Sequence, residues 1–253
     1  MRKMTFVFAL LASSIVASDA FASLKVTLFA PNNTTVEIND SDAGQSSGSV
    51  VVLSRTVGGY TFSVTAATST TTGQVTIQNM SVLTASGTAA GKVGILVSSN
   101  NAPVVGSTAS LQSNASVATA AGASNSQAAV SYSAYVDTAN SIATVTYSGG
   151  NVTVNNAGTL VTSKTGNITS PLGNPNDSWF ESGVGSVALS GATNVTMNLL
   201  VMADFSRINA GSAASHRVQF NGSLALSPVP EPASLSVWGL GGLLGLAVRR
   251  RYA

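Results

Sequence analysis

Cysteine is absent from the 253 residues, and charged residues make up only 8% of them. Without cysteine the chain has no disulfide framework and no thiolate metal site. Ordinary soluble domains carry about 25% charged residues, so hydroxyl and amide groups must form most of this surface. The apolar fraction of 44% still provides material for one substantial core. We therefore expect a single folded body, and the lack of cysteine favours a bacterial exported protein over a secreted animal one.

The formal net charge of +2 comes from the two ends of the chain. Five basic residues lie there: Arg2, Lys3, Arg249, Arg250 and Arg251. Between Ser23 and Pro228, six basic residues stand against seven acidic ones, so the body is close to neutral. A nucleic-acid-binding protein needs clustered Lys and Arg to neutralise phosphates. The charge distribution therefore excludes nucleic acid as a partner.

The start of the chain has the three-part layout of a secretory signal peptide. A basic beginning is followed by an apolar run over residues 5–17. Ala20 and Ala22 then place small side chains ahead of Ser23, as the signal peptidase pocket requires. We predict a signal-peptide helix over residues 1–22, cleavage by signal peptidase, and a mature chain that begins near Ser23.

A second apolar stretch lies near the other end of the chain. Leu235 to Val248 are 14 residues without a charge, about 21 Å long as a helix, against a hydrocarbon core of about 30 Å. Pro232 suits the first turn of a helix, so we expect a short membrane helix that starts there. The arginines at 249–251 should stay on the cytoplasmic side and leave the body outside the membrane.

The order of features from residue 229 onward resembles the PEP-CTERM sorting signal. Val229-Pro230-Glu231-Pro232-Ala233-Ser234 precedes the glycine-containing apolar segment, and three arginines follow it. In that family, Gram-negative bacteria carry such tails on exported proteins, and a membrane enzyme, exosortase, is regarded as processing them alongside exopolysaccharide synthesis.

The resemblance covers about the last 26 residues and implies roles for them alone. The recognition element would be Pro230, Glu231 and Pro232, and the membrane stop would be Arg249, Arg250 and Arg251. The resemblance implies nothing about the fold or function of the body. A plain membrane anchor that no sorting enzyme touches is the alternative.

Strand-like stretches, separated by Gly, Asn, Ser and Pro, recur through the body. They are Leu24–Phe29, Thr35–Ile38, Ser49–Ser54, Tyr60–Thr65, Gln74–Gln78, Lys92–Val97, Ala129–Val136, Ile142–Tyr147, Val152–Asn155, Val187–Leu189, Asn194–Val201 and Arg217–Leu226. Residues 148–151, Ser-Gly-Gly-Asn, read as a tight hairpin turn. No apolar period of 3.6 residues extends past a couple of turns. The pattern predicts an all-β domain over residues 23–226, an antiparallel β-sandwich or jelly roll, with the sorting segment at 227–253.

Two features of the body bear on its faces and loops. In Asn194–Val201 the alternation predicts a dry face and a wet face that carries Asn194, Thr196 and Asn198. Residues 106–127 are of low complexity and predict a long loop or a mobile insertion.

Two patterns that suggest hydrolase chemistry are weak. Gly44-Gln45-Ser46-Ser47-Gly48 matches G-x-S-x-G, but a strand follows it where a nucleophile elbow needs a helix. His216 is the only histidine and alternates with apolar residues, which is typical of a packed side chain. We therefore expect no catalytic residues and no cofactor.

Three carboxylates, Glu37, Asp40 and Asp42, are a weak calcium candidate, because hard cations prefer oxygen ligands. The EF-hand pattern fails, since the twelfth position counted from Asp40 is Val51. A solvated acidic turn is the favoured interpretation, and we assign no metal.

Asn174–Ser182 reads as a loop in which Asp177, Trp179, Phe180 and Glu181 come together. Aromatic rings stack on sugar faces and carboxylates bind hydroxyls, so this loop is the speculative sugar-binding site. A Trp–Phe pair that fills the core is the commoner outcome.

Taken together, the sequence predicts a non-enzymatic protein of the bacterial cell surface or extracellular matrix. We expect it to be exported, held transiently in the inner membrane, sorted by its tail and linked to exopolysaccharide and biofilm. The alternative is a carbohydrate-binding or carbohydrate-active protein that uses the Asp177–Glu181 loop.

Overall fold

A computed structural model describes residues 23–31, 34–69, 74–84, 91–104, 106–119, 126–170, 178–205 and 217–228. The predicted signal peptide, Asp177, His216 and the sorting segment from residue 229 onward lie outside these ranges. Within them, no helix is long and apolar enough to cross a membrane.

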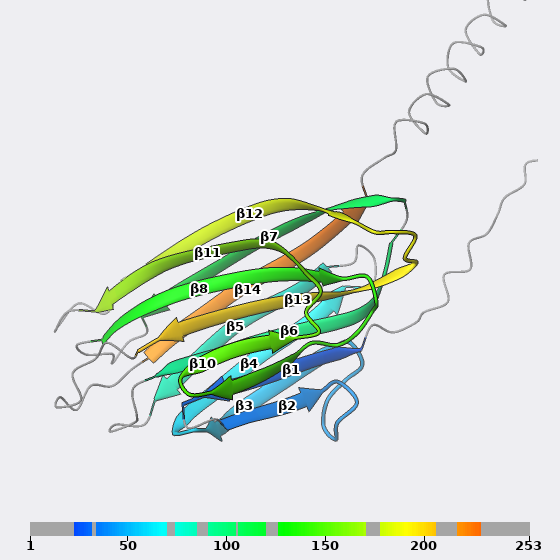
Figure 1. Cartoon of the computed structure of the whole chain (residues 1–253). Helices are drawn as coiled ribbons and strands as arrows, with labels where there is room; N and C mark the ends of the chain where they lie inside the picture. Colours follow the sequence, from blue (N-terminus) through cyan, green and yellow to red (C-terminus); the bar gives the residue numbers. More distant parts are fainter. Residues whose placement is uncertain are drawn as a thin grey trace, which may run out of the picture.

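The described chain forms fourteen strands (Figure 1). They are β1 Leu24–Ala30, β2 Thr34–Asn39, β3 Ser49–Val57, β4 Tyr60–Ser69, β5 Gln74–Thr84, β6 Lys92–Pro103, β7 Thr108–Thr119, β8 Ser126–Asp137, β9 Thr144–Ser148, β10 Asn151–Asn155, β11 Thr159–Ser170, β12 Ser178–Ala188, β13 Asn194–Asp204 and β14 Arg217–Pro228. The prediction of an all-β body is confirmed.

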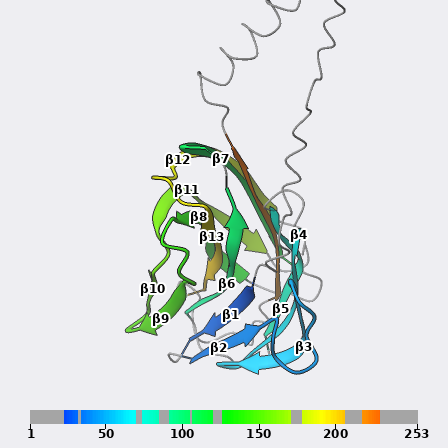
Figure 2. The same cartoon turned by 90° about the vertical axis from the view of Figure 1, so that its right-hand side faces the viewer.

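Twelve of the strands form two six-stranded sheets. Sheet 1 has the order β11-β8-β13-β6-β1-β2, and sheet 2 has the order β12-β7-β14-β5-β4-β3. Every pair of neighbouring strands is antiparallel. The chain crosses repeatedly between the sheets, for example at β2–β3, β5–β6, β7–β8, β11–β12 and β13–β14. This stacked, crossing arrangement is that of a β-sandwich of jelly-roll character (Figure 2).

The main core fills the space between the two sheets. Its largest fully buried side chains include Tyr60, Phe62, Tyr132, Phe205 and Phe220. Tyr60 stacks on Phe205 with ring centroids 6.4 Å apart. Alternating apolar positions supply this core, as the period of two in Val218, Phe220 and Leu224 requires.

A second, smaller core lies on the outer side of sheet 1. The hairpin β9–β10 covers that face (Figure 2) and packs Ala143 and Val145 against Phe29, Leu96 and Leu200. Tyr147 of the hairpin lies 6.4 Å from the Phe29 ring, and its hydroxyl accepts a hydrogen bond from Lys92 N (3.2 Å). The predicted turn of this hairpin is confirmed: Gly149 and Gly150 both have positive φ, 57° and 76°.

The prediction of a solvent-exposed face on Asn194–Val201 is wrong. Thr196 and Asn198 are fully buried, because the hairpin and the segments beside it cover the outer face of β13. Asn198 Nδ2 donates to the Ala157 carbonyl (3.1 Å), and Thr196 Oγ1 donates to Asn140 Oδ1 (3.2 Å). These hydrogen bonds compensate the burial of Thr196 Oγ1 and Asn198 Nδ2, whereas Asn198 Oδ1 is buried without a hydrogen-bond partner.

Two predicted loops are strands. Most of the predicted 106–127 loop is β7, which pairs with β12 on one side and β14 on the other. Residues 178–182 of the predicted 174–182 loop are the first half of β12. Several inward side chains of β7 and β12 are small or polar, so the sequence shows no clear alternation of apolar and polar residues there.

Candidate functional site

Three regions of the sandwich combine exposed or polar side chains in a way that could bind a ligand: β12, the acidic turn after β2, and a groove on sheet 1. β12 carries most of the predicted sugar-binding residues. Because successive side chains of a strand point to opposite faces, β12 separates Trp179 and Glu181 from Phe180. The structure therefore does not bring the two aromatic rings together into one platform.

Trp179 points inward and packs against the main core. Its ring lies 6.1 Å from that of Tyr132 at an angle of 51°. It also lies directly over Gly166 of β11, where an added Cβ would collide with the indole. The indole thus fills the space between β12 and β11, at the edge of the sandwich where the two sheets lie close together.

The two sheets approach each other closely at this end. Cβ atoms at Gly183 and Gly185 of β12 would collide with Thr162 and Val161 of β11. Ser113 of β7 is buried beside them, with its Oγ 3.3 Å from the Gly183 carbonyl and 3.4 Å from the Tyr132 hydroxyl. Small residues are needed here because larger ones would force the sheets apart.

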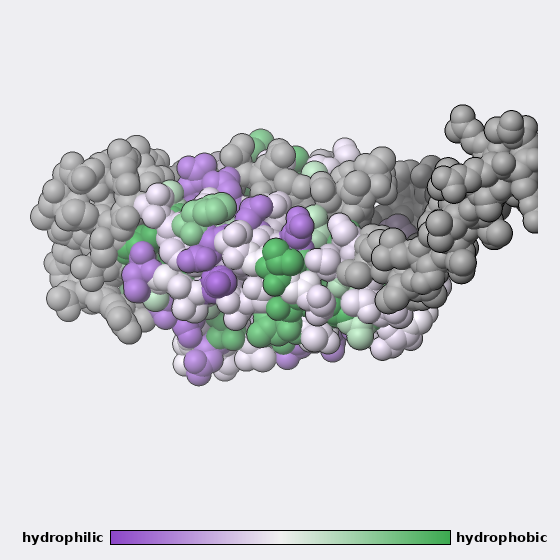
Figure 3. Space-filling model, turned by 90° about the horizontal axis from the view of Figure 1, so that it is seen from above, coloured by the Kyte–Doolittle hydropathy of each residue, from purple (hydrophilic) through white to green (hydrophobic). Residues whose placement is uncertain are grey.

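Phe180 and Val184 lie on the outer face of β12 and are 66% and 71% exposed. Their neighbours across the ladder with β7 are Ser116 and Gln112. Further along the same face, Asn114 Nδ2 donates to Ser223 Oγ (2.7 Å). Seen from above, the described surface is mostly pale or purple with a few separate green patches (Figure 3). This outer face is therefore a hydroxyl- and amide-rich surface with two exposed apolar side chains.

The acidic turn gives each of its carboxylates a separate partner. Glu37 Oε1 forms an ion pair with Lys25 Nζ (3.1 Å), and the Lys25 side chain is 8% exposed. Asp40 Oδ2 accepts from Gly48 N (2.8 Å), and Asp42 Oδ2 accepts from Asn39 N (2.8 Å). No group of three metal-ligating side chains forms among the described residues. The three carboxylates hold the turn together and do not converge on a cation.

The G-x-S-x-G sequence lies in the same turn and contains no nucleophile elbow. Ser46 and Ser49 exchange backbone hydrogen bonds (3.3 and 2.8 Å), and the Gln45 side chain binds the backbone of Val51 at both N and O. The strand β3 follows. A nucleophilic serine needs a strand before it and a helix after it, and this segment has neither.

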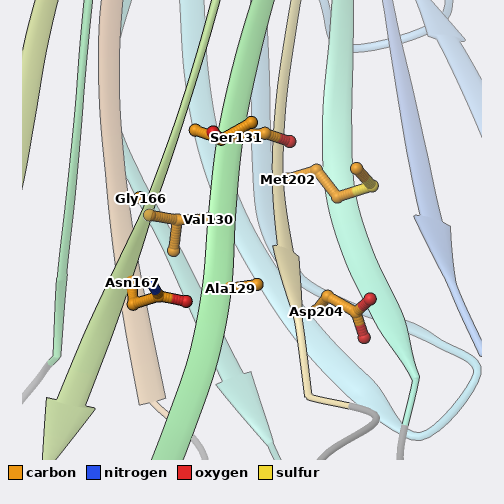
Figure 4. A pocket seen from close by; sticks show the side chains of 8 residues that line it. Ala129, Val130, Ser131, Gly166, Asn167, Met202 and Asp204 are labelled. Carbon is orange, nitrogen blue, oxygen red and sulfur yellow. The ribbon is translucent and has the colours of Figure 1, made fainter.

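A groove of about 350 Å³ lies between β11, β8 and β13 (Figure 4). Ser131, Thr165, Asn167 and Asp204 contribute hydroxyl, amide and carboxylate groups, and Met202 adds an apolar surface. Sequence analysis missed these residues because they come from three separate strands, one of which, β11, was not predicted. Such a set of donors and acceptors suits the hydroxyl groups of a neutral sugar.

Comparison with known proteins gives one family match. Three solved structures are distantly similar. TmCBM61 in complex with beta-1,4-galactotriose has 7% identity and a TM-score of 0.26, and the match covers 58% of this chain and 69% of that chain. The enzymatically active domain of bacteriophage CBA120 tailspike protein 4 has 11% identity and a TM-score of 0.24, with 66% of this chain and 19% of that chain covered, and a structure described as carbohydrate-binding modules of the beta-sandwich superfamily with promiscuous specificity has 10% identity and a TM-score of 0.23, with 81% and 72% covered. No curated protein matches the sequence. Residues 228–251, however, match the model of the PEP-CTERM protein-sorting motif. The chain therefore carries a PEP-CTERM protein-sorting motif in its C-terminal region, as its residues 229–251 indicate.

Proposed function

We propose that this chain is an exported, non-enzymatic surface or matrix protein whose sandwich is delivered by the PEP-CTERM tail. The observation that carries the proposal is the position of the motif. It begins at Pro228, and β14 ends at the same residue. The folded body and the sorting element therefore adjoin without an intervening linker.

The position of this junction limits where the tail can be cleaved without damage to the sandwich. β14 lies between β7 and β5 in the middle of sheet 2, so removing part of it would remove core residues such as Phe220 and Leu224. A cut beyond Pro228 leaves the sandwich complete. From Pro228 to Pro232 an extended chain spans at most about 14 Å. An exosortase in the inner membrane would therefore meet its recognition element close to the folded body.

The other end of the body is compatible with removal of a signal peptide. Ser23, the predicted first residue of the mature chain, donates from its backbone N to Asn100 Oδ1 (2.9 Å). Its carbonyl accepts a hydrogen bond from Asn100 N (3.1 Å). Signal peptidase cleavage ahead of Ser23 would keep both contacts, because both belong to Ser23 itself.

The test is a set of tail variants expressed in the native host. Replacing Pro230, Glu231 and Pro232 together by alanine removes the recognition element and keeps the apolar segment and arginines. We expect this variant to remain in the inner membrane at full tail length, while the unaltered chain reaches the outer surface or medium. Alanine in place of Ser227 is the matched control. Normal delivery of the triple variant would contradict sorting by this tail.

A second function, binding of an extracellular polysaccharide, is favoured by the groove shown in Figure 4. Its four polar side chains line one open hollow. Of the three described residues of the predicted site on β12, only Phe180 is exposed, and Glu181 lies on the opposite side of the strand. Affinity electrophoresis in gels that contain the host exopolysaccharide separates the two sites. Asn167→Ala with Asp204→Asn should abolish retardation, and Phe180→Ser should leave it unchanged. The reverse result would place the sugar on β12.

A further inference from the structure

The four edges of the two sheets are not equally protected against pairing with another strand. Natural edges are blunted by bulges, charges or short length. β3 has a bulge between Val52 and Arg55, with Ser54 at a φ of 55°. β2 has only six residues and includes Glu37. β11 has an irregularity between Leu160 and Thr162 and an exposed Lys164. Each of these three edges carries a recognisable protection.

Of these protections β12 has only a charged residue, Glu181, because the strand is long and contains no bulge. It runs for eleven residues without proline and pairs with β7 without a register shift. Its outward side chains carry no charge, and Phe180 and Val184 are the most exposed apolar ones among them. No described strand pairs with its other side. Its one charged residue, Glu181, points to the inner side of sheet 2.

We propose that the free edge of β12 pairs antiparallel with β12 of a second copy of this chain, about a two-fold axis at Ser182. In this register each Phe180 lies opposite Val184 of the other copy. On the inner side the large residues meet glycines: Trp179 lies opposite Gly185, and Glu181 lies opposite Gly183. Apolar cross-strand pairs stabilise a sheet, and the glycines add no side chain to collide. The strand is therefore complementary to itself in size, polarity and charge.

The neighbouring registers lack this complementarity. A shift of two residues in one direction places Glu181 opposite Glu181, and like charges directly opposite each other destabilise a sheet. The same shift in the other direction places Phe180 opposite Ser186 and Val184 opposite Ser182, so the two exposed apolar side chains lose their apolar partners. The sequence of β12 thus favours one register, because register follows the side-chain pattern.

The first test uses the absence of cysteine from the chain. Paired residues of antiparallel strands have Cα atoms about 4.5–5.5 Å apart, within the range that a disulfide bridges. Full-length protein with Ser182→Cys should give a covalent dimer on a non-reducing gel after air oxidation. Thr153→Cys, which is exposed on β10, is the matched control and should remain a monomer. Equal cross-linking of both variants, or none at Ser182, would overturn the proposal.

The second test changes charge at the two-fold axis, where Ser182 is exposed in the single chain. Ser182→Glu and Ser182→Lys each place like charges opposite each other, so each variant alone should lose the dimer in analytical ultracentrifugation. A one-to-one mixture should recover a dimer that contains both variants, because opposite charges then face each other. A dimer that tolerates Ser182→Glu, or a mixture that stays monomeric when the unaltered chain dimerises, would contradict pairing at β12.

Discussion

At the scale of single residues, glycine decides how closely the two sheets approach. Gly166 of β11 leaves the space that the Trp179 indole occupies. The sequence presented Trp179 beside Phe180 either as a sugar platform or, more commonly, as a core-filling pair, and nothing in it reveals a glycine thirteen residues away as the partner of the ring. Contacts between sheets depend on pairs remote in sequence, which alternation alone cannot identify.

We predict that Gly166→Ala destabilises the sandwich by about 1–3 kcal/mol, because the new methyl group forces Trp179 out of its site. Urea unfolding followed by tryptophan fluorescence measures both the loss of stability and the change around the indole. Ser163→Ala on the same strand is exposed and should cost less than about 0.5 kcal/mol. Equal stability of the two variants would show that Trp179 does not rest on Gly166.

Gly150 in the β9–β10 turn offers a second test at this scale. Its φ of 76° is open to glycine and tolerated by asparagine, but it is strained for a β-branched residue. No atom lies within 4 Å of a Cβ added there, so the strain is purely conformational. Gly150→Val should lower the free energy of unfolding by about 1–2 kcal/mol, and Gly150→Asn should lower it by clearly less. The same loss in both variants would contradict the turn geometry.

At the scale of elements, the sequence predicted those strands whose buried faces are large and apolar. β4, β13 and β14 alternate visibly, and the structure contains all three. β7, β11 and most of β12 were missed. Their inward positions include Ser113, Ala115, Gly183 and Gly185, because the sheets approach too closely there for larger side chains.

The hairpin β9–β10 was predicted, but its role as a cover was not. It buries Phe29, Leu96 and Leu200 on the outer face of sheet 1, the face on which the alternation of β13 predicted a wet surface. Among the strands beneath it, β1 is buried at every position, so its outward side chains Lys25, Thr27 and Phe29 are covered as well as its inward ones. A strand covered on both sides loses the period of two in its burial pattern.

Substitutions on the two faces of β9 test this covering role. Val145 is 9% exposed and faces the second core, whereas Ser148 is exposed at the end of the same strand. Val145→Asp should cost at least about 2 kcal/mol, since an unpaired charge would be buried, and it should increase binding of a hydrophobic dye. Ser148→Asp should change neither by much. If neither substitution changes the stability or the dye binding, the hairpin does not cover this face.

At the scale of the whole molecule, a sandwich of twelve described strands with a covering hairpin is followed by a PEP-CTERM motif that begins where the last described strand ends. The sequence predicted the all-β class and the motif, because each rests on a local pattern. It could not predict the order of strands in the sheets or the groove on sheet 1, since both depend on which distant strands become neighbours. The neutral, cysteine-free composition fits an exported body stabilised by its core and hydrogen bonds without disulfides.

We propose that both ends of the chain are sorting signals that the cell recognises and removes, while the sandwich between them remains whole. Intact-mass spectrometry of the protein isolated from its native host tests it most directly. We expect a mass that corresponds to a chain from Ser23 to a residue just beyond Pro228. A mass that still includes Arg249, Arg250 and Arg251 would contradict it and favour a permanent membrane anchor.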